Sequence, residues 1–259
     1  MTAVNPDTYT DFDTYCKATE CGIGDQLFAS VLIGDLQEAA EHGSNKLGYG
    51  TDFLKENNIC WIILRMQIKL NRLPVWPEQF TITTWATDLQ KISYGRDFEI
   101  KAKDGSVIGQ ATSTWILADL DTHRPVIARK RPELPPYTPD TGAAKVFGAD
   151  CPKLKFPERE EVEAVTSKPV ISKYADYSEL DRNLHVNNSR YTAWAYDVLY
   201  KYGVDVNNVR EIIINYISEV KAGVKVDLFL VEQEDSLLIC GYKNDDVKAF
   251  CVEMRLRDA

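Results

Sequence analysis

Apolar residues recur with two different periods along the first half of the chain. Between Leu32 and Leu47 the apolar or small residues return every three or four positions, which predicts a helix with one buried face, and Gly48 suits its C-terminal end. Four runs rich in β-branched and aromatic residues follow, at residues 59–70, 79–87, 94–103 and 106–117, and they predict strands. Asp104-Gly105, between the last two runs, predicts a hairpin with a type I′ turn.

A proline-rich stretch then interrupts this pattern. Residues 124–139 contain prolines at positions 125, 132, 135, 136 and 139, and charged sequence continues to about residue 163. Proline removes a backbone donor and fixes φ, so we expect a linker that runs over the surface. We therefore divide the chain into a first unit at residues 1–135, a linker at residues 136–165 and a second unit at residues 166–259.

The second unit repeats the element order of the first. Residues 190–202 place aromatic and aliphatic side chains on one face of a predicted helix, and Gly203 ends it. Strand-like runs follow at residues 211–221, 224–232, 236–242 and 247–256, with Asn244-Asp245-Asp246 as the last turn. A long helix followed by an antiparallel meander indicates an α+β fold in which a sheet curls around the helix. Two such units can join edges and extend one sheet.

Composition limits the classes of function. The 39 acidic and 30 basic residues give a formal net charge of −9, which argues against nucleic-acid binding because that needs a basic surface. The N-terminal sequence lacks the features of a secretion signal or a transit peptide, and no run approaches the roughly 18 apolar residues of a membrane span. We therefore expect a cytoplasmic protein whose six cysteines are mostly reduced.

Several familiar signals of catalysis are missing from the sequence. It contains three histidines and no His-Glu-x-x-His, so a zinc hydrolase is not indicated. It has neither a Gly-x-Ser-x-Gly elbow nor a Gly-x-x-x-x-Gly-Lys-[Ser/Thr] phosphate loop. We expect no metal and no cofactor.

One polar segment carries the candidate chemistry. Residues 178–191 read Ser-Glu-Leu-Asp-Arg-Asn-Leu-His-Val-Asn-Asn-Ser-Arg-Tyr. If the segment is extended, the side chains of Asp181, Asn183 and His185 face the same side. Asn187 or Asn188 suits the N-cap of the following helix, whose first amides could stabilise an oxyanion. The alternative is a polar capping loop whose histidine binds a backbone carbonyl.

These residues resemble the signature of a known family. The run Asp-x-Asn-x-His-Val-Asn-Asn-x-x-Tyr-x-x-Trp at residues 181–194 is similar to that of the acyl-ACP thioesterases, where ACP is acyl carrier protein. Residues 58–67 resemble a strand of that family, of the type Asn-x-x-Trp-x-x-x-Arg-Met-Gln. Pro-Val-Trp-Pro-Glu from residue 74, Gly-Arg-Asp from residue 95 and Ala-Thr-Ser-Thr-Trp from residue 111 follow in the expected order. The resemblance covers nearly the whole chain.

The resemblance implies a double hot-dog fold, in which two tandem units each wrap an antiparallel sheet around a long helix. It also implies that the catalytic Asp, Asn and His of the family fall on Asp181, Asn183 and His185, and a further catalytic glutamate on Glu219. The plant members carry a cysteine next to that glutamate, whereas this chain has Val220. A mechanism that uses a thiolate at that position therefore cannot operate here.

The implied reaction is hydrolysis of fatty acyl-ACP to free fatty acid and ACP, the step that ends fatty acid synthesis. Without a thiol, water would attack the thioester directly, and Glu219 and His185 are the candidate general bases, of which we favour Glu219. Asp181 would orient its neighbours, Asn183 and His185 would position the water and the carbonyl, and amides near Asn188 would stabilise the oxyanion.

The family further implies an acyl pocket shaped by the first unit, and we expect Trp61, Arg65 and Gln67 to contact the substrate. The basic run formed by Arg124, Arg129, Lys130 and Arg131 is a solvated linker face or a contact for the acidic carrier.

Two other functions and the oligomeric state stay open from the sequence. An acyl-CoA thioesterase would use the same fold and chemistry, and a non-catalytic acyl-binding protein would use the fold alone. The chain could act as a monomer or a homodimer. The preferred acyl chain length is not readable, because one methylene changes discrimination by only about 1–3 kcal/mol.

Overall fold

The computed structural model describes residues 9–90, 92–131, 134, 145–244 and 246–257. The strands are β1 (Thr10–Tyr15), β2 (Ile59–Leu70), β3 (Gln79–Gln90), β4 (Ser93–Ala102), β5 (Val107–Asp119), β6 (Ile171–Tyr174), β7 (Val209–Tyr216), β8 (Lys225–Glu232), β9 (Leu237–Lys243) and β10 (Val247–Leu256). The α-helices are α1 (Ala29–Lys46), α2 (Thr51–Glu56), α3 (Arg159–Thr166) and α4 (Asn188–Tyr202).

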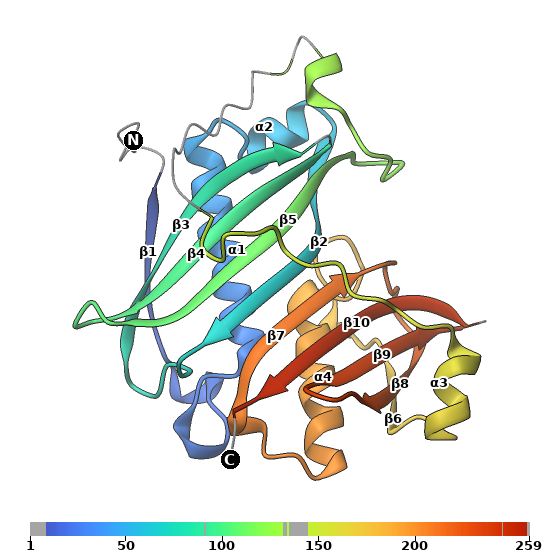
Figure 1. Ribbon diagram of the computed structural model, residues 1–259. Helices are drawn as coiled ribbons and strands as arrows, with labels where there is room; N and C mark the ends of the chain where they lie inside the picture. The colour runs from blue at the N-terminus through green and yellow to red at the C-terminus, as the bar shows by residue number, and fades with distance from the viewer. Residues whose placement is uncertain (1–8, 91, 132–133, 135–144, 245, 258–259) are drawn as a thin grey trace.

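One antiparallel sheet unites the two halves of the chain (Figure 1). Its strands lie in the order β1-β3-β4-β5-β2-β7-β10-β9-β8-β6. Strand β2 of the first half pairs with β7 of the second, from Arg65 opposite Asn215 to Lys69 opposite Glu211. This ladder satisfies backbone groups that would otherwise form two exposed edges. The α+β fold with joined edge strands is therefore confirmed.

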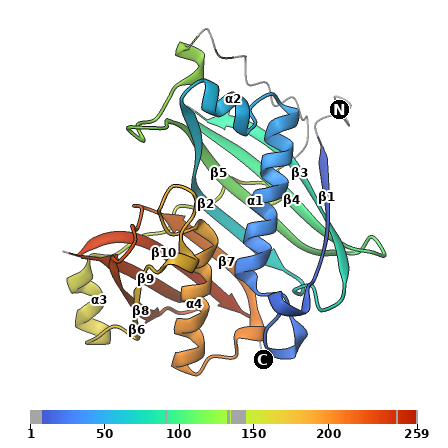
Figure 2. The same ribbon diagram turned by 180° about the vertical axis from the view of Figure 1, so that it is seen from behind.

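Helices α1 and α4 lie side by side on one face of the sheet (Figure 2). The three- and four-residue spacing of their apolar side chains turns one stripe of each helix toward the sheet, as with Leu32 and Leu36 of α1 and Trp194 and Val198 of α4, all buried. Each fully buried side chain of this kind stabilises the fold by about 1.5–3 kcal/mol. Helix α4 ends as predicted at Gly203, whose φ of 89° is left-handed.

The turn between β4 and β5 differs from the prediction. A type I′ turn needs a positive φ at both central residues, but in this turn only Gly105 has one, at 84°. The Ala102 amide donates to the Ser106 carbonyl and the Gly105 amide donates to the Ala102 carbonyl, which makes a three-residue loop. Asp104 favours this loop because its carboxylate accepts hydrogen bonds from the amide and hydroxyl of Ser106, at 2.9 and 2.6 Å.

Several element boundaries also differ from the prediction. Strands β1 and β6, at the two ends of the sheet, and the short helices α2 and α3 were not predicted. Strand β7 ends at Tyr216 rather than at residue 221, so Glu219 lies in the loop that follows. In the predicted turn at residues 244–246, Asp245 lies outside the described residues.

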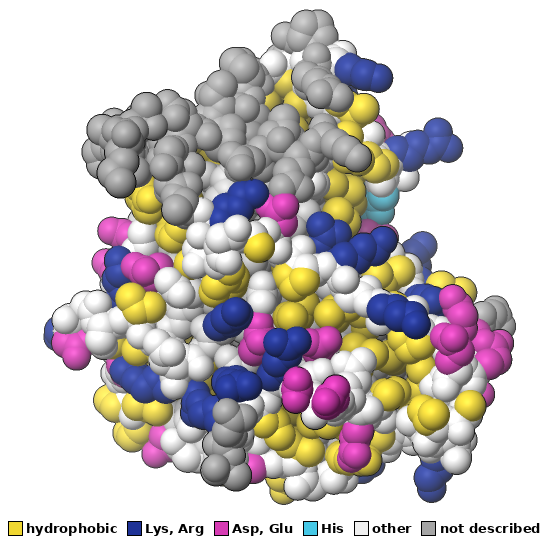
Figure 3. Space-filling view, in the orientation of Figure 1, with side chains coloured by type: hydrophobic (Ala, Val, Ile, Leu, Met, Phe, Trp, Pro, Cys, Tyr) yellow, Lys and Arg dark blue, Asp and Glu magenta, His cyan; other side chains and the backbone are white. Residues whose placement is uncertain are grey.

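The sheet face opposite α1 and α4 is crossed by residues 145–158, which lie in front of the strands in Figure 1. The Val146 amide donates to the Asp97 carboxylate at 2.7 Å, and the Leu154 amide donates to the Asn215 side chain at 3.0 Å. Helix α3 follows and buries Val162 against side chains of β8 and β9. The described part of the predicted linker is thus tied to the sheet, while residues 136–144 lie outside the described residues. Figure 3 shows charges of both signs interspersed with apolar side chains over this face.

Candidate active site

The segment that carries Asp181, Asn183 and His185 is a tight turn. The Asp181 amide donates to the His185 carbonyl at 2.7 Å, and the Leu184 amide donates to the Asp181 carbonyl at 3.1 Å. The Asp181 carboxylate accepts hydrogen bonds from the amides of Asn183 and His185, at 2.8 and 3.1 Å. The segment is therefore not extended, so the alternation of side chains expected of an extended segment does not apply to it. An aspartate can bind the backbone of its own turn, and it competes in this way with an extended conformation.

The N-terminus of α4 follows this turn. Asn187 is the N-cap, and its side chain accepts hydrogen bonds from the Ser189 amide and hydroxyl at 3.0 and 2.9 Å. The Asn187 carbonyl accepts from the Arg190 amide at 2.9 Å. Because these two amides are engaged, the Asn188 amide is the candidate donor to a negatively charged group. Of the two residues predicted as the N-cap, Asn187 or Asn188, the structure has Asn187 in that position.

Backbone contacts place Glu219 beside the turn. The Val186 amide donates to the Val220 carbonyl at 2.8 Å, and His185 forms an antiparallel bridge with Lys221. Nε2 of His185 and Oε2 of Glu219 are 3.5 Å apart, which is long for a hydrogen bond. Glu219 therefore lies next to His185, but the two side chains do not form a short hydrogen bond.

A residue without an assigned role in the sequence analysis completes this cluster. His123, in the turn after β5, places Nδ1 3.0 Å from Oε1 and 3.1 Å from Oε2 of Glu219. The rings of His123 and His185 lie 5.9 Å apart at an angle of 80°. No spacing in the sequence connects His123 with residues 181–219, because the contact arises only after the sheet has joined the two halves.

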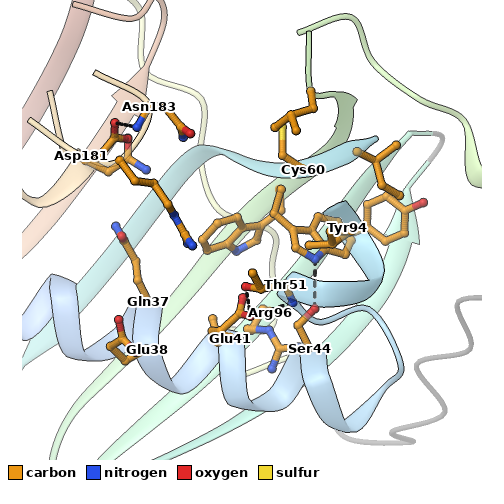
Figure 4. A pocket seen from close by; sticks show the side chains of 18 of the residues that line it. Gln37, Glu38, Glu41, Ser44, Thr51, Cys60, Tyr94, Arg96, Asp181 and Asn183 are labelled. Carbon is orange, nitrogen blue, oxygen red and sulfur yellow. Dashed lines mark hydrogen bonds between the residues drawn. The ribbon is translucent and has the colours of Figure 1, made fainter. Parts of the chain in front are cut away.

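A cavity of about 650 Å³ extends from the turn along α1 (Figure 4). In Figure 4, Asp181 and Asn183 lie at one end, and Ser44 and Tyr94 lie toward the other. Aromatic rings from the strands and polar side chains from α1 share its walls: Trp61, Tyr94, Trp115, Gln37, Glu38 and Glu41. The volume lies within the range of small-molecule sites, roughly 300–1,000 Å³. Both halves of the chain line the cavity.

One of the three predicted substrate-binding residues lies in this cavity. Trp61 lines it, but Arg65 and Gln67 follow a register shift between Ile63 and Arg65 in β2. Such a bulge adds one residue and turns the following side chains to the other face of the strand. Gln67 donates there to the Glu211 carboxylate on β7. The structure therefore does not bring Arg65 and Gln67 to the cavity.

Cys60 precedes Trp61 and also lines the cavity. Burial raises the pKa of its thiol above the ordinary value, and the negative charges of Glu219 and Asp119 raise it further. The thiolate, not the thiol, is the nucleophile of a cysteine. Both effects disfavour a thiolate at Cys60.

Two further observations concern the described ranges of the chain. No group of three or more His, Cys, Asp or Glu side chains in them is arranged to hold a metal ion. No helix in them is long and apolar enough to cross a membrane.

A long helix packed on an antiparallel sheet, present twice and joined through β2 and β7, defines a double hot-dog protein. The structure is similar to the acyl-ACP thioesterase from Bacteroides thetaiotaomicron, with a TM-score of 0.76 and 24% identity over 97% of this chain and 98% of that one. It is also similar to the 12:0-ACP thioesterase from Umbellularia californica, with a TM-score of 0.76 and 17% identity over 96% and 97% of the two chains. The expected fold is confirmed.

Sequence comparison then gives the family. The profile of the acyl-ACP thioesterase N-terminal domain matches residues 15–130, and that of the C-terminal domain matches residues 160–249. The oleoyl-acyl carrier protein thioesterase 2 of Arabidopsis thaliana chloroplasts is 28% identical over 227 residues. That match covers 82% of this chain and 59% of the length of the relative. The chain belongs to the acyl-ACP thioesterase family.

Proposed function

We propose that the protein hydrolyses the thioester of a fatty acyl-ACP and releases a free fatty acid and the carrier thiol. The observation that carries this proposal is the Glu219 carboxylate beside His185, in a chain of this family. Glu219 and His185 do not themselves line the cavity, but His185 closes the turn whose Asp181 and Asn183 do. The Glu219 side chain is 43% exposed and the His185 side chain 15%, so solvent water reaches the carboxylate.

Glu219 acts as the general base in this proposal. It removes a proton from water while the water oxygen bonds to the thioester carbonyl carbon. The tetrahedral intermediate then collapses, the C–S bond breaks, and the leaving sulfur takes up a proton. General-base assistance of this kind contributes about 10²- to 10⁴-fold in rate. His185, at 3.5 Å from the carboxylate, shares in positioning the water.

The turn and the start of α4 hold the carbonyl in this proposal. The amide of Asn188 and the side chain of Asn183, both lining the cavity, donate to the carbonyl oxygen as it becomes negatively charged. One donor to an oxyanion contributes about 10²- to 10³-fold. Asp181 keeps the turn closed through its two bonds to backbone amides.

The acyl chain occupies the cavity beside Trp61, and the carrier docks on the basic segment that follows His123. Arg124 and Lys130 are exposed, Arg131 is half-buried, and the side chain of Arg129 lies outside the described residues. Pro125 forms a bridge with Ala118 of β5, which keeps the start of this segment beside the turn that carries His123. Basic side chains there suit an acidic carrier protein.

The decisive experiment measures release of free acid from a chain-length series of acyl-ACPs, with matched acyl-CoAs in parallel. Glu219→Gln should lower kcat by about 10²- to 10⁴-fold. Glu253→Gln is the matched control, because the Glu253 carboxylate pairs with Arg255 on β10 rather than with His123 and His185, and it should keep the wild-type rate. Full turnover by Glu219→Gln would move the base to another residue. Faster turnover of acyl-CoA than of acyl-ACP would overturn the proposal that the substrate is carried by ACP. No turnover of either series would leave binding of an acyl chain, without hydrolysis, as the function.

Charge reversal tests the docking segment. Lys130→Glu should raise the KM for acyl-ACP, because it replaces an exposed basic side chain with an acidic one that repels the acidic carrier. A KM for acyl-ACP equal to that of the wild type would contradict docking of the carrier on this segment.

Location and assembly are separate parts of the proposal. The six cysteines are free in the structure, which supports the reducing cytoplasm as the location. Light scattering distinguishes the monomer from the homodimer.

A further inference from the structure

His123 is held by a tight turn in an uncommon backbone conformation. The Asp119 carboxylate accepts hydrogen bonds from the Thr122 amide and hydroxyl, at 2.8 and 2.7 Å, and the His123 amide donates to the Asp119 carbonyl at 2.9 Å. The φ of His123 is 53°, in the left-handed region. This conformation costs a residue other than glycine about 1–3 kcal/mol and persists where the surroundings determine it. The turn thus fixes the backbone from which the His123 imidazole reaches Glu219 of the second half.

The Glu219 carboxylate needs a restraint of this kind. At 43% exposure, a glutamate side chain exchanges among several rotamers unless a partner holds it. His185 approaches it only to 3.5 Å. Lys243 donates to the backbone carbonyl of Glu219, at 2.6 Å, and leaves the carboxylate free to rotate. The contacts of His123 Nδ1 with both carboxylate oxygens, at 3.0 and 3.1 Å, are shorter than that of His185.

We propose that His123 is a positioning residue for the hydrolysis. Its Nδ1–H donates to the Glu219 carboxylate and keeps it directed at His185 and the neighbouring cavity, so His123 acts through Glu219 and does not contact the substrate. The inference rests on the proposed function, in which Glu219 is the general base. The first half of the chain then restrains the base that the second half supplies.

Three substitutions of His123 change its hydrogen bond to Glu219 and keep the backbone of the turn. Asparagine, aspartate and glycine all accept a positive φ, so His123→Asn, His123→Asp and His123→Gly keep the backbone conformation. Asparagine places an amide donor near the position of Nδ1, aspartate has the same shape without a donor and repels Glu219, and glycine removes the side chain. His42→Asn is the matched control, because His42 is exposed and contacts Phe12 of β1.

The kinetic test uses the acyl-ACP assay. His123→Gly and His123→Asp should lower kcat by about 10- to 100-fold, because the base is no longer aligned, while KM changes by less than about 2-fold. His123→Asn should recover most of the rate, and His42→Asn should match the wild type. In the Glu219→Gln background, His123→Gly should cause no further loss, since the two residues act as one unit. A raised KM at unchanged kcat, wild-type kcat in all three variants, or the full loss in the Glu219→Gln background would overturn the positioning role.

An imidazole ¹⁵N spectrum tests the contact without turnover, and so separates this inference from the proposed function. The chain has three histidines, so single substitutions assign the signals. A His123 Nδ1 that carries a proton and shifts in Glu219→Gln supports the inference. A His123 ring protonated only at Nε2 overturns it, whether or not the wild type hydrolyses acyl-ACP.

Discussion

Asp181 and His185 are joined by two hydrogen bonds that run in opposite directions. The Asp181 amide donates to the His185 carbonyl at 2.7 Å, and the Asp181 carboxylate accepts from the His185 amide at 3.1 Å. The pair closes the turn that carries Asn183 and sets the position of His185 beside Glu219. Asp181 therefore shapes the site through the backbone before any substrate is bound.

This relationship predicts that Asp181→Ala lowers kcat/KM by about 10- to 100-fold, because His185 and Asn183 lose their alignment. The unfolding free energy should fall by about 1–3 kcal/mol, since two amides lose their acceptor. The matched control is Asp205→Ala, because the Asp205 carboxylate accepts from the Asn207 amide at 3.1 Å in a turn elsewhere in the fold. We expect it to lose stability and keep its turnover. If both variants lost turnover in proportion to stability, the specific role of Asp181 would be wrong.

The N-cap of α4 gives a second prediction. Asn187→Ala should lower the unfolding free energy by about 1 kcal/mol, because the Ser189 amide loses its acceptor. It should also lower kcat, since the first turn of α4 carries the candidate oxyanion donor at Asn188. Asn187→Asp keeps a capping oxygen and should stay close to the wild type in urea unfolding. Equal loss of stability in both variants would contradict the capping role.

The raised pKa of the Cys60 thiol predicts slow alkylation. At pH 8 iodoacetamide should label Cys60 more slowly than a free cysteine, whose pKa is about 8.5, and the rate should rise as the pH increases further. Glu219→Gln removes one of the nearby negative charges, so it should speed labelling at a fixed pH, while Glu253→Gln should not. Peptide mass spectrometry after timed labelling measures the rate. An unchanged rate in Glu219→Gln would contradict the proximity of the two groups.

Asp35 on α1 predicts a pH-dependent change in stability. Burial first, and then the charge of Glu20, raise the pKa of Asp35 from 3.8 to about 6. The folded chain thus binds this proton more tightly than the unfolded chain, and stability is lost as the pH rises from about 4 to about 6. Asp35→Asn should therefore raise the unfolding free energy at pH 7.5 by about 1 kcal/mol, allowing for solvent screening, and have little effect at pH 4. The same gain at both pH values in urea unfolding would contradict this assignment.

The sequence predicted two kinds of element well: helices that bury one complete apolar stripe, and strands that are buried on both faces. Strand β2 spans residues 59–70 as predicted, because a central strand carries a long run of apolar residues. Strand β1 was missed because it lies at the end of the sheet and pairs through polar groups. Asp11 and Asp13 accept hydrogen bonds from the hydroxyls of Thr83 and Thr81, both at 2.7 Å, and aspartate is rare in strands.

The site was predictable where its contacts are local. The cap at Asn187 joins residues two positions apart, so a short pattern contains it. His123 and Glu219 are 96 positions apart, and only the pairing of β2 with β7 brings them together. Arg65 and Gln67 were expected at the cavity from the family resemblance. A single extra residue in β2, which no local pattern revealed, turns both side chains to the other face of the strand.

The ladder between β2 and β7 also constrains how the molecule can move. A seam of backbone hydrogen bonds in the middle of a continuous sheet cannot work as a hinge, so the two halves cannot swing apart to admit an acyl chain. An acyl chain therefore enters the cavity while the two halves keep their mutual arrangement in the sheet.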